Sequence, residues 1–125
     1  MNQECLFCSI SDERVIASNE YVFAIRDGYP VADGHTLIIP HRHAVDFFGL
    51  TSDESEGARL LIHEIAKNLK DGDDSITAFN IGLNAGVDAG QTILHCHYHL
   101  IPRRKGDVEN PRGGIRHLIP GKGFY

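Results

Sequence analysis

Short runs of apolar residues, separated by glycine and proline, predict three strands. The runs at 21–26 (YVFAIR) and 35–39 (HTLII) end at Asp27-Gly28 and at Pro40. Runs of this length bounded by turn residues are typical of strands, and the short connection between them predicts an antiparallel pair. The run at 76–83 (ITAFNIGL) predicts a third strand.

Between the second and third of these strands the apolar positions change to helical spacing. Thr51, followed by Glu54 three residues later, has the form of a capping box, which supplies hydrogen-bond partners to the free amides at a helix start. His63 lies off the apolar stripe and is expected to be exposed. DGDD at 71–74 ends the helical pattern. The stripe comprises Ala58, Leu61, Ile62, Ile65, Ala66 and Leu69.

The segment 91–102 carries histidine at every second position, and we expect it to be a strand. Successive side chains of a strand point to opposite faces, so His95, His97 and His99 would share one face. Strands before and after one long helix predict an α+β fold with a mostly antiparallel sheet, in a single domain spanning 1–125. The core-facing register of the segment would hold Leu94, Cys96, Tyr98 and Leu100.

The composition favours a globular protein without a membrane helix. Charged residues make up 23% and hydrophobic residues 42% of the 125 residues, and no apolar run approaches the length of a membrane span. The N-terminus lacks the pattern of a signal peptide, so we expect a cytoplasmic location. The net charge of −5 argues against nucleic acid as a partner.

Charge is unevenly distributed along the chain. The segment 103–125 has six basic and two acidic residues, which leaves it at +4 and the rest of the chain at −9. A basic segment directly after the histidines suits a small phosphorylated ligand, although many basic tails are only solvated chain ends.

The loop before the histidines offers a place for a phosphate. Gly86 and Gly90 allow backbone amides to approach an anion closely. Asn84, Gln91 and Thr92 flank the same loop, so their side chains would lie at the entry to the histidine strand. Phosphoryl transfer needs a positioned nucleophile and compensation of negative charge, and an imidazole can be the nucleophile if its other nitrogen donates to a fixed acceptor. The middle histidine, His97, is the best placed.

Three cysteines in a chain without a secretory signal do not indicate a disulfide framework. Cys96 is expected in the core. Cys5 and Cys8 form CLFC, a spacing that serves metal binding and dithiol redox chemistry alike, so spacing alone leaves both open.

The segment His95–Ile101 (HCHYHLI) resembles the signature of the histidine triad (HIT) superfamily of nucleotide hydrolases and transferases. GHTLIIP at 34–40, AGQT at 89–92 and LIPRR at 100–104 support this resemblance. The resemblance implies a five-stranded antiparallel sheet with one long helix, and a homodimer.

The resemblance also implies roles for individual residues. His97 matches the nucleophile that attacks the α-phosphate and forms a nucleotidyl-histidine, which water then hydrolyses. His99 and His35 match positions that contact the phosphate or assist the leaving group. Asp27 matches a residue that holds the ribose hydroxyls. The positions that contact phosphate from the loop match Asn84, Gln91 and Thr92.

Several members that begin with CxxC bind a structural zinc, and the resemblance implies how this chain would do so. The implied ligands are Cys5, Cys8, His43 and His95. His41 competes with His43, because both lie in the motif PHRH. A closed Cys₂His₂ set is expected of a structural ion, so no metal is needed for catalysis.

The third histidine of the triad bears on the reaction. Uridylyltransferase-like members have glutamine at the position of His99, so the resemblance implies a hydrolase of dinucleoside polyphosphates or nucleoside phosphoramidates. Two alternatives stay open: a non-catalytic module that binds a purine nucleotide, and an enzyme that uses a metal at the histidines.

Overall fold

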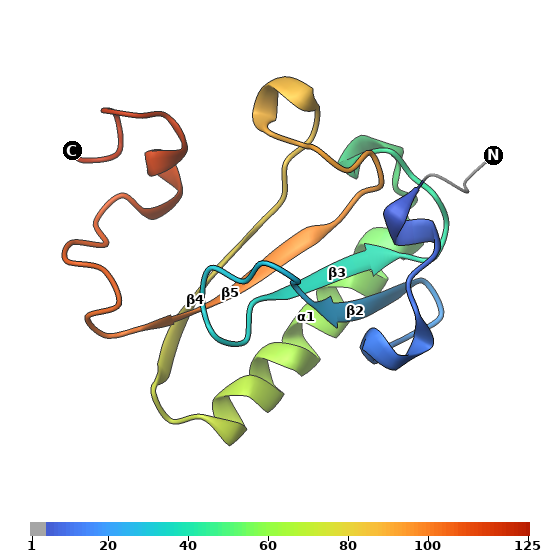
Figure 1. Cartoon of the computed structure of the whole chain (residues 1–125), viewed down its shortest axis with the longest axis horizontal. Coiled ribbons are helices and arrows are strands. Elements are labelled where there is room, and N and C mark those ends of the chain that lie inside the picture. Colours follow the sequence, from blue (N-terminus) through green and yellow to red (C-terminus); the bar gives the residue numbers. More distant parts are fainter. Residues whose placement is uncertain (1–4) are drawn as a thin grey trace.

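The structure, a computed structural model, describes residues 5–125. Five strands and one long helix make up its regular elements (Figure 1). These are β1 (Val15–Ser18), β2 (Val22–Arg26), β3 (Thr36–Pro40), α1 (Ser52–Gly72), β4 (Ile76–Gly82) and β5 (Tyr98–Arg104). Short 3₁₀ turns occupy the N-terminal segment, the loops and the C-terminal segment.

The strands form a single antiparallel sheet in the order β1-β2-β3-β5-β4. β5 therefore lies between β3 and β4, with His99 opposite Leu37 on one side and opposite Gly82 on the other. The expected α+β class, the antiparallel pair of β2 and β3, and the five-stranded sheet with one helix are confirmed.

The helix α1 begins where the sequence predicts. The Thr51 hydroxyl accepts from the Glu54 amide at 3.1 Å, and the Glu54 carboxylate accepts from the Thr51 amide at 2.8 Å, which completes the capping box. The predicted stripe packs on one sheet face with Val22, Ala24, Ile38 and Leu100. Each large side chain buried there contributes about 1.5–3 kcal/mol. Within residues 5–125, no helix has the length and apolarity that crossing a bilayer requires.

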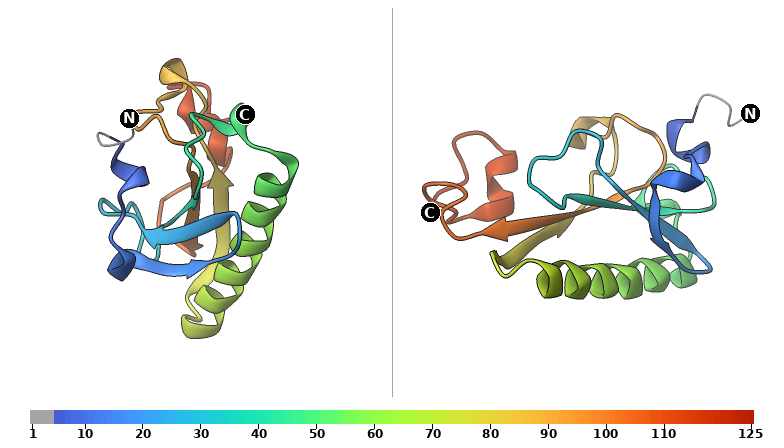
Figure 2. Two further views of the ribbon diagram at one scale, coloured as in Figure 1. Left: turned by 90° about the vertical axis from the view of Figure 1, so that its right-hand side faces the viewer. Right: turned by 60° about the horizontal axis from the view of Figure 1, so that its bottom comes forward.

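The opposite sheet face carries a second apolar cluster and several loops. The cluster consists of Phe7, Phe23, Ile25, Leu37 and Ile39. Figure 2 shows α1 along one face, whereas the N-terminal segment, the loops before β3 and β5, and the C-terminal segment lie on the other. Because side chains alternate along a strand, His99 points to this second face, away from Leu100 and α1.

The predicted strand over 91–102 is wrong in its first half. β5 starts only at Tyr98, so just one histidine of the three lies in a strand. The Cys96 amide donates to the Ala44 carbonyl at 2.7 Å instead of joining the sheet. Leu94, expected in the core, is half exposed, while Cys96 and Leu100 are fully buried as predicted.

The apolar pattern also missed β1. Val15–Ser18 is a short edge strand whose residues are alternately half-buried and exposed. Four residues of mixed character give too weak a periodicity to predict a strand, and β1 forms because β2 offers it a partner.

Candidate functional site

His97 is held in one tautomer by the backbone. Its Nδ1 lies 2.8 Å from the carbonyl oxygen of His95. A carbonyl can only accept a hydrogen bond, so Nδ1 carries the proton and Nε2 keeps its lone pair. Phe7 packs its ring edge-to-face against the His97 ring, with centroids 5.0 Å apart, which limits the ring's rotation. The half-buried His97 therefore presents a basic nitrogen in a fixed orientation.

Two further histidines and a carboxylate form a chain beside His97. The Val31 amide donates to His35 Nδ1 at 3.2 Å, so the proton of a neutral His35 is on Nε2. That nitrogen lies 2.8 Å from His99 Nδ1 and 3.4 Å from the Asp27 carboxylate. His99 Nδ1 thus accepts, and its own proton is on Nε2, an available donor next to the His97 ring.

Burial keeps both of these histidines neutral near pH 7. Desolvation lowers the pKa of His99 to about 4, and the neighbouring His97 and His35 rings add to this effect. Desolvation also lowers the pKa of His35, which the Asp27 carboxylate partly offsets. A neutral His99 therefore offers one hydrogen-bond donor, the N–H group at Nε2.

The glycine loop is tied down by Gln91. The Gln91 side chain is buried, and its oxygen accepts from the Gly86 amide at 2.8 Å. Its nitrogen donates to the carbonyls of Val45 at 2.6 Å and Ile93 at 3.1 Å. Gly86 and Gly90 have φ of 102° and 98°, values that favour glycine. In this structure the Gln91 carboxamide bonds to the loop's own backbone, while Asn84 is half-buried and Thr92 exposed.

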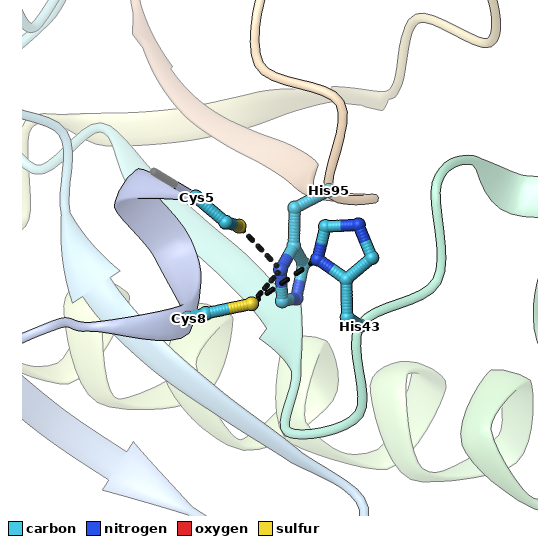
Figure 3. A group of neighbouring side chains, drawn as sticks. All are labelled: Cys5, Cys8, His43 and His95. Atoms are coloured by element: carbon cyan, nitrogen blue, oxygen red, sulfur yellow. Dashed lines mark hydrogen bonds between the residues drawn. The ribbon is translucent and has the colours of Figure 1, made fainter. Parts of the chain in front are cut away.

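The four residues implied as zinc ligands converge (Figure 3). Cys5 Sγ lies 3.3 Å and Cys8 Sγ 3.4 Å from His95 Nδ1, and Cys8 Sγ lies 3.1 Å from His43 Nδ1. The buried His95 donates from Nε2 to the Pro40 carbonyl at 2.9 Å, which leaves Nδ1 free to face the sulfur atoms. His41 lies outside the cluster, since its Nε2 donates to the Asn19 carbonyl and its ring stacks on Phe23.

These donor atoms fit a tetrahedral zinc ion. Bond lengths of about 2.3 Å to sulfur and 2.0 Å to nitrogen place tetrahedral ligand atoms about 3.3–3.8 Å apart. All four donor atoms lie within 4.8 Å of one another. Burial, together with the Cys5 thiol, raises the pKa of Cys8 to about 11, so a cation is needed to stabilise its thiolate. When bound, zinc supplies a structural tie between the N-terminal segment and the residues before β5.

An ion pair fixes the loop that bears His43. Arg42 donates to Glu54 at 2.9 and 2.8 Å and to the Gly49 carbonyl at 2.6 Å. Glu54 is also the capping residue of α1, so the His43 loop is attached to the helix N-terminus. The sequence interpretation missed Arg42, because nothing in the pattern pairs it with Glu54. It also missed Phe7, although its place between Cys5 and Cys8 was a usable signal.

A cavity of about 460 Å³ lies beside this cluster and holds no triad histidine. It is lined by Phe7, Cys8, Ile10, Asp12, Val15, Ser18, Phe23 and His41.

Comparison with known proteins identifies the family. The profile of the HIT domain matches residues 9–106. The chain belongs to the HIT family. An uncharacterised HIT-like protein of Mycoplasma pneumoniae is 37% identical over 106 residues, covering 82% of this chain and 73% of that protein.

Two other HIT relatives have named activities. An adenosine 5'-monophosphoramidase of Saccharomyces cerevisiae is 30% identical, over 83% of this chain and 65% of its own length. An asymmetrical bis(5'-nucleosyl)-tetraphosphatase of Schizosaccharomyces pombe is 38% identical over 78 residues, 62% of this chain and 42% of its own.

The solved structures agree with the fold. A zinc-bound histidine triad protein of Mycobacterium smegmatis has a TM-score of 0.78 at 30% identity, covering 88% of this chain and 82% of that one. The HIT fold of this chain is thus confirmed.

The metal cluster predicts the effect of replacing single histidines. We expect one zinc ion per purified chain, and we expect His43→Ala to lose it, because the variant lacks a ligand of the closed set. His41→Ala, two residues away but outside the cluster, is the matched control and should retain the metal. Elemental analysis and thermal denaturation measure the outcome. Equal zinc content in both variants would contradict this ligand set.

The lowered pKa of His99 predicts a pH dependence of stability. The unfolded imidazole titrates near 6.5 and the folded one at about 4, so the unfolded state binds more protons between these values. His99 therefore destabilises the fold progressively as the pH falls through this range. We expect His99→Gln to lose less stability than wild type between about pH 6.5 and pH 4.5, measured by urea denaturation. The control, exposed His63→Gln, should match wild type; an unchanged slope in His99→Gln would contradict the burial argument.

Proposed function

We propose that this HIT protein hydrolyses the α-phosphate bond of nucleoside phosphate derivatives through a nucleotidyl-His97 intermediate. The observation that carries the proposal is the hydrogen bond from His97 Nδ1 to the His95 carbonyl at 2.8 Å, which leaves Nε2 free for attack. The activities of the two named relatives support a phosphoramidate or dinucleoside polyphosphate as substrate.

The first step forms a bond from His97 Nε2 to the α-phosphorus and breaks the bond from phosphorus to the leaving group. His99 Nε2–H donates a hydrogen bond to the leaving oxygen or nitrogen, which departs with the bonding electron pair and takes any proton it needs from solvent. The positive charge of the intermediate lies on the His97 ring, which is bonded to phosphorus at Nε2 and protonated at Nδ1. The contacts of His35 Nε2 with His99 Nδ1 at 2.8 Å and with the Asp27 carboxylate at 3.4 Å hold the His99 donor in place. Water then attacks the phosphorus, the bond to Nε2 breaks and returns its electron pair to the His97 ring, and the proton of the attacking water passes to solvent.

The loop before β5 supplies the contacts to phosphate oxygens in this proposal. Asn84 and Thr92 reach the anion directly from the two ends of the loop. Gln91 acts on the phosphate indirectly, because its side chain holds the Gly86 amide in place, and also by direct contact with the phosphate. Asp27 Oδ1 accepts from the Tyr29 amide at 2.8 Å, which orients the carboxylate toward ribose hydroxyls.

A catalytic metal at the histidines is the alternative with structural support, because Asp27, His35 and His99 place donor atoms within 4.8 Å of one another. The geometry favours a hydrogen bond instead. The 2.8 Å between His35 Nε2 and His99 Nδ1 is shorter than the separation of about 3.3 Å between two nitrogens on one tetrahedral ion. The zinc in this proposal is structural.

Homodimerisation and a cytoplasmic location remain predictions. Two features are compatible with a homodimer: β4 is an edge strand, and Ile81 on it and Leu60 on α1 are each half exposed.

The role of His97 predicts a large loss of rate on its removal. We expect His97→Ala to lower kcat by at least about 10³-fold on adenosine phosphoramidate and diadenosine polyphosphates, while its thermal stability and zinc content stay near wild type. Quenched wild-type reactions should contain a chain with the added mass of one nucleotide, located to His97 by peptide mass spectrometry. The exposed control His63→Ala should keep full activity.

Two results would contradict the proposed function. One is an undiminished rate in His97→Ala. The other is a wild-type protein that binds AMP but turns over no member of the substrate panel, which would support the non-catalytic module.

A further inference from the structure

The C-terminal segment, residues 111–125, lies on the same sheet face as the triad. Gly82 of β4 is the register partner of His99, and Ile115 Cδ1 lies 3.8 Å from the position that a Gly82 Cβ would take. Asn80 lies on the same face of β4 as Gly82. Its side-chain nitrogen is 3.7 Å from the position that a Gly114 Cβ would take. Figure 2 shows this segment and the loops around the triad on the side of the sheet opposite to α1.

This segment is folded upon itself. His117 Nε2 donates to the Arg112 carbonyl at 2.9 Å, and its ring packs edge-to-face against Phe124 at 4.5 Å. Gly113 has a φ of 94°, and a Cβ there would lie 2.0 Å from the Gly123 carbonyl oxygen. The close approach of two backbone stretches, which only glycine permits, gives the segment a defined shape.

Two guanidinium groups of this segment lie over one aromatic ring. Arg112 and Arg116 are 4.8 and 4.7 Å from the centroid of the Tyr125 ring. Arg103 and Arg104, by contrast, pair with Asp107 and Asp73. Among residues 5–125 no carboxylate lies within ion-pair distance of Arg112 or Arg116. The two guanidiniums thus carry charge that the fold itself does not neutralise.

The two sides of the triad differ in chemistry. On the β2 and β3 side lie Asp27 and the apolar cluster that contains Ile25. On the β4 side lie the two unneutralised arginines. A nucleotide bound with its α-phosphorus at His97 and its ribose at Asp27 would direct its leaving group toward β4.

We propose that Arg112 and Arg116 form an anion site that binds the phosphates of a polyphosphate leaving group. Guanidinium groups bind phosphate oxygens in a bidentate manner and stay charged at every physiological pH. This inference rests on the proposed function and narrows it to dinucleoside polyphosphates. An amine released from a phosphoramidate carries no negative charge for these arginines to bind.

The test uses the full chain with Arg112→Gln and Arg116→Gln combined. The matched control, Arg59→Gln with Lys70→Gln, removes the same charge from α1 on the other face. We expect the first variant to lose at least about tenfold in kcat/KM on diadenosine tetraphosphate and less than twofold on adenosine phosphoramidate. The control should keep both values. An equal loss on both substrates, or no loss on the tetraphosphate, would overturn the anion site.

A binding measurement separates failure of this site from failure of the proposed function. By titration calorimetry, inorganic tripolyphosphate should bind the wild type and the control pair, and bind the double Gln variant at least about tenfold more weakly. If the wild type hydrolyses neither substrate, the proposed function fails. The titration still tests the anion site in that case. Equal binding of tripolyphosphate by all three proteins overturns the anion site. Should the Gln variant denature at a lower temperature, the Arg112→Lys, Arg116→Lys pair keeps the charge and must bind tripolyphosphate.

Discussion

The site depends on one hydrogen bond, from His97 Nδ1 to the backbone carbonyl of His95. The bond assigns the proton to one ring nitrogen and leaves a lone pair on the other, as the proposed role of nucleophile requires. Its acceptor is well fixed, because His95 is buried, donates to the Pro40 carbonyl, and faces Cys5 and Cys8. The cysteine-histidine cluster thereby positions the ring of His97, the proposed nucleophile. Phe7, held between the two cysteines, adds a packing contact to the same ring.

The two faces of the sheet have different roles. One face buries α1 and the larger apolar cluster, while the other carries the histidines and the loops. The antiparallel register places His99 between Leu37 and Gly82. β5 therefore lies between the apolar cluster that contains Leu37 and the C-terminal segment that packs near Gly82. Neutral His99 and His35 are a consequence of this partial burial, since desolvation lowers the pKa of both.

Much of the fold could be predicted from the sequence, because its signals are local. The capping box at Thr51 and the stripe through Leu61 fix α1, and bounded apolar runs fix β2, β3 and β4. The prediction of one strand through all three histidines is wrong, because the Cys96 amide bonds to the Ala44 carbonyl instead of a neighbouring strand and His95 turns toward Cys5 and Cys8. Residue types alone also could not show that Gln91 bonds to its own loop or that Arg42 secures the His43 loop through Glu54. Such pairings depend on the path that each loop takes in the folded chain, which the residue types do not specify.

The tautomer of His97 is the property on which the account depends most directly. Long-range ¹H–¹⁵N correlation spectra of the zinc-loaded protein near pH 7.5 report which ring nitrogen carries the proton. We predict the Nδ1–H form for His97, with an unprotonated Nε2. A His97 ring protonated on Nε2, or one that exchanges evenly between the two tautomers, would contradict its assignment as the nucleophile.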